Sequence, residues 1–174
     1  MNKKNIGAGV IAVLLAGYIF AAPYITVNRM KNAAENHDGE TLSEYVDFPT
    51  LRQSLKDQMN AKLAKEMAQE VDDNPFAALG AVFGGMMVDK MVDAYVTSAG
   101  ITELMKGVTP DSEPVGSRSE SDSTEEAFAN ASMSYESFSK FAVTISDDES
   151  NDDVRFILRR QGIGWKLTEI MLPL

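Results

Sequence analysis

The chain has 174 residues, of which 44% are hydrophobic, and its formal net charge is -10. So acidic a balance argues against general nucleic-acid binding, and the length allows one domain together with a membrane anchor. The absence of cysteine excludes disulfides, thiolate nucleophiles and cysteine-ligated metals. The one histidine, His37, lies in a polar stretch without a second ligand or a placed nucleophile, so we expect neither a metal nor a cofactor.

The first pattern along the chain is an apolar run from Ile6 to Ile25, about as long as a helix needs to be to cross a bilayer. A cleaved signal peptide, the alternative, would need small residues at positions -3 and -1 of the cleavage site. Cleavage after Ala22 would place the large Phe20 at position -3, which fits poorly. The sequence therefore predicts an uncleaved transmembrane anchor over residues 1–30.

The charges around this run bear on its orientation. Lys3 and Lys4 form a very short basic tail, which favours an N-terminus in the cytoplasm, although Arg29 and Lys31 follow the run on the other side. We expect a single-pass protein of a bacterial inner membrane, with residues 31–174 in the periplasm.

A helical part is expected to follow the anchor. Asp47 suits the position before a helix, where its carboxylate accepts a backbone N–H, and Pro49 suits the first turn. From Leu51 to Val71 large apolar residues recur every four positions, which indicates one long amphipathic helix. The next run, Phe76–Val88, is apolar on every side. This favours a buried helix, and the alternative is a helix in a membrane interface or a subunit contact.

A change of composition separates the helices from the C-terminal part. Residues 108–130 are rich in Ser, Glu, Asp, Pro and Thr, which predicts a flexible acidic linker. Apolar residues then alternate with a period of two in three segments, and the turn Gln161–Gly164 joins the last two as a hairpin. We predict an α+β fold for the single domain 31–174, with a helical layer packed on a three-stranded antiparallel sheet. Trp165 is expected to be buried between this sheet and the helix over Phe76–Val88.

Four basic side chains make the hairpin positive within an acidic protein: Arg155, Arg159, Arg160 and Lys166. One interpretation is that they balance the acidic turn Asp147–Asp153, and the other is that they contact an anionic partner or a lipid headgroup. The turn lacks the central glycine and the distal glutamate of a calcium-binding loop, so we expect it to be solvated and to hold no metal.

Three segments, Tyr45–Lys56, Asn74–Gly80 and Trp165–Pro173, resemble a bacterial membrane-anchored family known as domain of unknown function 2939. The resemblance covers most of the chain outside the linker. It implies a membrane anchor, but no established activity and no catalytic residues. The order of the elements is also similar to that of cone-shaped domains related to nuclear transport factor 2, where a curved sheet and helices enclose a pocket. That likeness concerns the fold alone.

Three kinds of function stay open. The first is a membrane-anchored extracytoplasmic binding or interaction domain, whose partner is a protein or an amphiphile, in addition to the bilayer around Ile6 to Ile25. The second is a structural envelope protein. The third is an enzyme that uses a carboxylate in a pocket as a base, and Asp47 is the one candidate for that role, although a helix cap explains this residue better.

Overall fold

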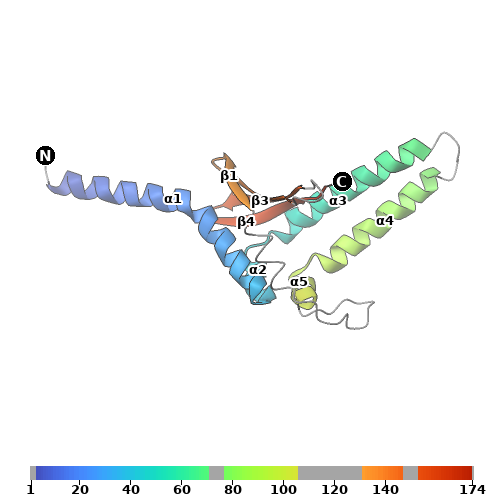
Figure 1. Cartoon of the computed structure of the whole chain (residues 1–174), viewed down its shortest axis with the longest axis horizontal. Coiled ribbons are helices and arrows are strands. Elements are labelled where there is room, and N and C mark those ends of the chain that lie inside the picture. The colour runs from blue at the N-terminus through green and yellow to red at the C-terminus, as the bar shows by residue number, and fades with distance from the viewer. Residues whose placement is uncertain (1–2, 71–76, 106–130, 147–152, 174) are drawn as a thin grey trace.

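The computed structural model describes residues 3–70, 77–105, 131–146 and 153–173, which form a helical part followed by a sheet (Figure 1). The helices are α1 (Lys3–Glu35), α2 (Gly39–Glu44), α3 (Phe48–Glu70), α4 (Ala77–Tyr95) and α5 (Ser98–Met105). The strands are β1 (Ser132–Ser137), β2 (Lys140–Ser146), β3 (Asp153–Gln161) and β4 (Gly164–Met171). The α+β order is the one that the sequence predicts.

The sheet is antiparallel, and its order β1-β2-β3-β4 means that each strand pairs with its neighbours along the chain. The prediction of three strands is wrong, because the sheet has a fourth strand, β1, at its edge. Met133 and Tyr135 are the large apolar residues of β1, and serines occupy most of its other positions. An edge strand with one solvated face needs few apolar residues. Its composition therefore looks like that of the serine-rich segment before it.

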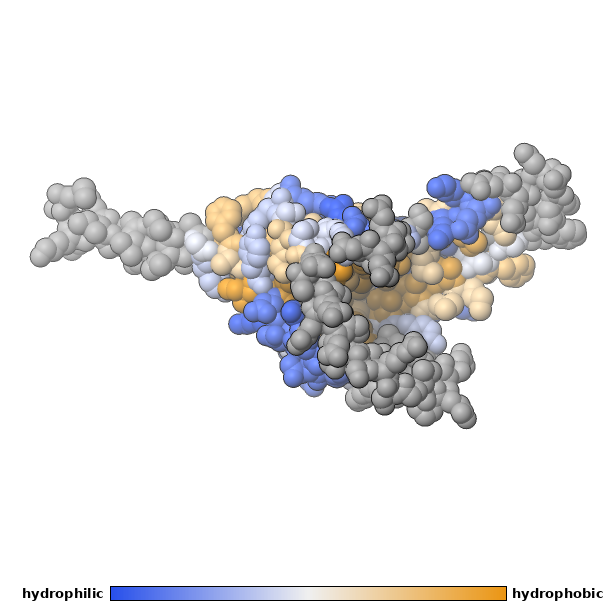
Figure 2. All heavy atoms as spheres, in the orientation of Figure 1, coloured by the Kyte–Doolittle hydropathy of each residue, from blue (hydrophilic) through white to orange (hydrophobic). Residues whose placement is uncertain are grey.

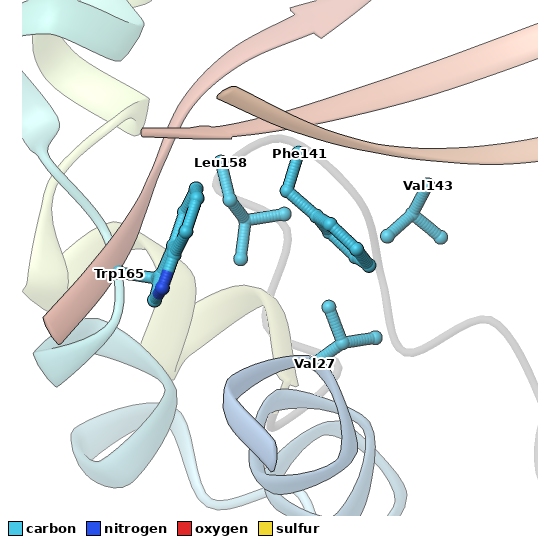
Figure 3. Packing of buried hydrophobic residues seen from close by; sticks show 5 residues of the cluster. All are labelled: Val27, Phe141, Val143, Leu158 and Trp165. Atoms are coloured by element: carbon cyan, nitrogen blue, oxygen red, sulfur yellow. The ribbon is translucent and has the colours of Figure 1, made fainter. Parts of the chain in front are cut away.

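The core lies between one face of the sheet and α1. Phe141, Val143, Leu158 and Trp165 project from the strands toward Val27 of α1, as Figure 3 shows. Trp165 is only 2% exposed, and its ring meets that of Phe141 edge to face, with centroids 6.2 Å apart. The predicted burial of Trp165 is confirmed, but the helix that covers it is α1.

A second cluster extends this core toward α3. Val46, Leu51 and Leu167 are each at most 6% exposed, and they pack together where α2 leads into α3. The N-terminal part of α3 therefore joins α1 in covering the sheet. The two clusters share Met30 and Phe156 as partly buried neighbours, so they form one continuous apolar layer.

Helix α1 changes direction where it meets the sheet (Figure 1), and Pro23 lies inside it. Proline has no N–H, so the carbonyl of Ile19 lacks the donor that an uninterrupted helix would provide. The sheet supplies donors instead. Arg160 donates from Nη2 to the Ile19 carbonyl over 3.4 Å, and the Tyr135 hydroxyl donates to the Phe20 carbonyl over 2.9 Å. The bend of α1 is thus fastened to the sheet by hydrogen bonds.

Helices α3 and α4 pack side by side as an arm that extends away from the sheet (Figure 1). The prediction that the apolar helix packs against the C-terminal hairpin is therefore wrong. Glycines explain the difference: a Cβ atom added at Gly80 would lie 2.9 Å from the methyl of Met67, and one at Gly84 would lie 2.8 Å from a methyl of Leu63. The glycine side of α4 fits closely against α3. The bulky side, which includes Phe83 at 69% exposure, is left outward.

Two predicted features lie outside the described residues, namely the linker at 108–130 and the acidic turn at 147–152. Within the ranges that the structure describes, no helix combines the length and the hydropathy that a membrane span requires. The last residues of the predicted span lie against the sheet. Pro23 is less than 2% exposed and Val27 is 5% exposed.

We expect Trp165→Ala to lower the free energy of unfolding by about 3 to 5 kcal/mol, because the ring is enclosed and its loss leaves a cavity. Denaturant titration of the purified chain, followed by circular dichroism, measures the change. Ile163→Ala is the matched control two residues away, where the side chain is 92% exposed and the expected change is within about 0.5 kcal/mol. Equal effects of the two substitutions would contradict this description of the core.

Candidate functional site

A cavity of about 260 Å³ lies between the sheet and the helices. We call it the apolar cavity. The residues that line it are Val27, Met30, Lys31 and Ala34 of α1, Leu42 of α2, Val46, Leu51 of α3, Ile101 of α5, and Val143, Phe156, Leu158, Leu167 and Ile170 of the sheet. Residues from both core clusters thus leave unfilled space where four helices converge on one face of the sheet.

Backbone pairing holds one wall of the apolar cavity in place. Residues 45–47 run alongside β4 as a short parallel bridge centred on Val46 and Leu167. The Leu167 N–H donates to the Tyr45 carbonyl over 2.8 Å, and the Asp47 N–H donates to the Leu167 carbonyl over 2.9 Å. The entry into α3 is therefore anchored to the sheet, which fixes the positions of Val46 and Leu51 in the wall.

The lining of the apolar cavity is hydrocarbon or thioether except for Lys31. The ammonium of Lys31 lies 3.4 Å from the carboxylate of Glu35, one helical turn further along α1. No lining residue carries a carboxylate, a hydroxyl or an imidazole. Such a surface offers water almost no hydrogen bonds and suits an apolar ligand.

A second cavity, of about 320 Å³, lies where α1 meets the turn between β3 and β4. Its polar lining residues are Thr26, Arg29, Glu44, Tyr45, Gln161 and Lys166. Arg29 donates to the Tyr45 hydroxyl over 3.4 Å. The indole of Trp165 also lines this cavity, and its N–H is buried without a hydrogen-bond partner among the described residues. We call it the polar cavity.

The structure gives the four basic residues that the sequence singles out different contacts, although Arg159 and Lys166 are register partners on β3 and β4. Arg159 makes two hydrogen bonds to Glu169, of 2.7 and 3.0 Å, and Arg155 is paired with Glu136. The guanidinium of Arg160 lies 4.3 Å from the centre of the Phe138 ring and 5.0 Å from that of Trp165. Lys166 lines the polar cavity. Glutamates therefore pair with two of the four residues, Arg155 and Arg159.

Asp47 caps α3, as the sequence predicts. Its Oδ1 accepts the N–H of Thr50 over 3.3 Å, and its Oδ2 accepts a hydrogen bond from the Gln161 amide. Burial works to raise the pKa of Asp47, but the bonds from Thr50 and Gln161 and the charge of Lys166 outweigh it, so the pKa lies below its ordinary value. A carboxylate held in this way is a weak base. It lines neither cavity.

The protein has an α+β fold, in which helices cover one face of an antiparallel sheet. The apolar cavity lies between the helices and the sheet. The chain belongs to the family described as "Protein of unknown function (DUF2939)", whose model matches residues 12–104. The match includes α2, α3 and α4 and ends before the sheet. The segment Trp165–Pro173, which also carries the resemblance, lies outside it.

No curated protein matches the chain, and no solved structure does. The likeness to nuclear transport factor 2 therefore stays a prediction.

Sequence reasoning suggested a pocket only through the likeness to cone-shaped domains, and it did not identify the residues that line the apolar cavity. Its lining residues come from four helices and three strands, and each of them reads along the chain as an ordinary core position. Whether facing core positions touch or leave space depends on how the layers are spaced, which periodicity does not encode. Ala34 is the one sign of this space in the lining of α1, because it is a small residue at a position where the helix faces the core.

Acid is expected to weaken the fold through two carboxylates. The hydrogen bond from Lys140, at 2.7 Å, is the main cause that lowers the pKa of Glu136, and the charge of Arg155 adds to it; the pKa of Asp47 is lowered as well. Since these folded-state pKa values lie below the unfolded ones, the unfolded chain binds more protons near pH 4. The stability they provide is present above about pH 5 and is lost as pH falls below about pH 4.

Melting temperature measured against pH tests this expectation. Glu136→Gln should melt at a lower temperature than the parent chain at pH 7, and the difference should shrink as pH falls below about pH 4 and vanish once pH lies below the lowered pKa of Glu136 in the folded chain. Glu103→Gln, an exposed position on α5, serves as the control and should follow the parent at every pH. A gap between Glu136→Gln and the parent that stays constant down to acid pH would contradict the role given to Glu136.

Proposed function

We propose that the chain is a membrane-anchored, extracytoplasmic binding domain, and that the apolar cavity holds the hydrocarbon part of an amphiphile. The observation that supports this most is the lining of the apolar cavity, where Lys31 is the one charged residue. A bound water needs two to four polar partners, and this lining provides almost none. A hydrocarbon chain needs no such partners.

The size of the cavity sets the scale of binding. At about 30 Å³ for each small group, the apolar cavity accommodates roughly eight methylene groups. Each buried methylene contributes about 0.8 kcal/mol, so a chain of this length gains about 6 kcal/mol. Taken alone, that gain would give a dissociation constant on the order of tens of micromolar, and the freedom that the ligand loses on binding makes the affinity weaker than this. Such affinity suits a ligand that is abundant in a membrane.

The N-terminal sequence supports the anchor in this proposal. The chain carries no charged residue from Asn5 to Asn28, and Lys3 and Lys4 precede this stretch. This pattern favours a cytoplasmic N-terminus and a domain on the periplasmic side of a bacterial inner membrane. The ligand would then be a lipid-derived molecule that leaves the outer leaflet of that membrane.

A second candidate function is interaction with another protein, which includes a structural role in the envelope. The observation that favours it is the outward side of α4, where Phe83 is 69% and Met87 is 67% exposed. Exposed apolar side chains at neighbouring positions on a helix are typical of a protein contact. The enzyme hypothesis has no such support, since Asp47 is occupied as a helix cap.

Photocrosslinking tests the binding proposal. A diazirine-bearing fatty acid is added to membranes that contain the full chain, and mass spectrometry locates the modified peptides. We expect modification near Met30 and Phe156, with competition by unlabelled fatty acid. Ala34→Phe projects a ring into the apolar cavity, so it should lower the crosslinking yield about tenfold, which corresponds to about 1.4 kcal/mol of binding.

Ala64→Phe is the matched control, because Ala64 is exposed on α3 and lines neither cavity. Its yield should equal that of the parent chain. A yield that Ala34→Phe leaves unchanged, or modification confined to the first residues of α1, would show that the fatty acid occupies the bilayer rather than the cavity.

A further inference from the structure

Most of the exposed large apolar side chains among the described residues lie in two places, one on α4 and the other where α1 enters the sheet. The second group is here called the entry patch. Its residues are Tyr18, Phe20, Tyr24 and Ile25 of α1, Phe138 in the turn between β1 and β2, and Ile163 in the turn between β3 and β4. Figure 2 shows hydrophobic residues crowded at this end of the domain, next to the start of α1.

We propose that the entry patch is seated in the interfacial layer of the lipid bilayer, so that the tips of both β-hairpins dip into the membrane from which α1 emerges. The proposal rests on the membrane anchor in the proposed function and adds a surface to it. It commits to lipid as the occupant, because the uncharged stretch of α1 runs directly into the patch.

Contacts hold the two hairpin tips beside the same turns of α1. Arg160 donates to the Ile19 carbonyl, and the same guanidinium lies 4.3 Å from the centre of the Phe138 ring, which ties the first tip to α1. Ile163, at the second tip, lines the polar cavity together with Tyr18 and Ile25. A helix and two turns therefore contribute side chains to the patch.

The length of the apolar run is a second, independent reason to place the entry patch in the interfacial layer. A helix needs about 20 residues to cross a hydrocarbon core of about 30 Å. Pro23 and Val27 are buried against the sheet, so lipid does not surround the helix beyond about Phe20. From Ile6 to Phe20 the run has about 15 residues, which span about 22 Å. The shortfall of about 8 Å matches the depth of roughly 5 to 10 Å to which interfacial elements sink.

The chemistry of the patch is that of a membrane interface. Tyrosine is enriched at the headgroup level, where its ring is apolar and its hydroxyl is wet, and Tyr18 and Tyr24 are 61% and 44% exposed. Behind the patch, Arg29 and Lys166 line the polar cavity, where they face the level of the headgroups. Basic residues near the surface attract anionic lipids.

The absence of native cysteine makes the test direct. Single cysteines are introduced at Gly17, Ile163 and Phe83, and each is labelled with an environment-sensitive nitrobenzoxadiazole dye. Gly17 is an exposed position of α1 with no neighbouring atom within 4 Å of an added Cβ, and Phe83 is an apolar site on the arm that is 69% exposed. The full chain is reconstituted into vesicles of phosphatidylethanolamine and phosphatidylglycerol, with or without spin-labelled lipid.

We expect the dye at Ile163 to emit at shorter wavelength than the dye at Phe83, and to be quenched by spin-labelled lipid about twofold more strongly. Quenching at Gly17 without quenching at Ile163 would mean that α1 is embedded and the tips are not, so the seating is wrong while the anchor stands. No quenching at either position would refute both. Iodide is a quencher that acts from water. If the dye at Ile163 is protected from iodide but is not quenched by spin-labelled lipid, protein covers the patch, which also contradicts the seating.

Discussion

The missing N–H of Pro23 is the constraint on which the rest of this domain depends. A carbonyl inside a helix without its donor must find another one or remain unpaired at a considerable cost in free energy. Here the carbonyls of Ile19 and Phe20 bond to Arg160 of β3 and Tyr135 of β1, which are two different strands of the sheet. The hydrogen bonds at the bend of α1 therefore join this helix to the sheet.

The positions of the aromatic cluster and of the apolar cavity follow from this connection between α1 and the sheet. Because α1 bends over the sheet, Val27 reaches the aromatic cluster around Trp165 and Phe141 (Figure 3). Further along α1, Met30 and Ala34 face the opening between the sheet and α3, and the helix does not fill it. The apolar cavity is therefore the space left between a helix fastened at one end and an α3 entry fastened to β4 at the other.

The sequence allowed the element types to be predicted, but not how they are packed. The period of four after Leu51, the cap at Asp47 and the alternation around Phe156 are local patterns, and each gives the correct helix or strand. The partner of each element is not local. The helix that begins at Ala77 was expected on the sheet because of its apolar composition, yet close glycine contacts set it against α3. The sequence predicts that Arg160 either balances the acidic turn or contacts an anionic partner or lipid headgroup, because nothing near it in sequence refers to Pro23.

The most direct test of this account is a double-mutant cycle between Pro23→Ala and Arg160→Met. An alanine at position 23 restores the N–H that the Ile19 carbonyl lacks, so Arg160 should matter less in that background. We expect a coupling energy of about 1 kcal/mol in the free energy of unfolding, against additivity for the cycle of Arg160→Met with the exposed Pro49→Ala. Additivity within about 0.3 kcal/mol for the first cycle would contradict the account, because Arg160 would then not be compensating for the proline.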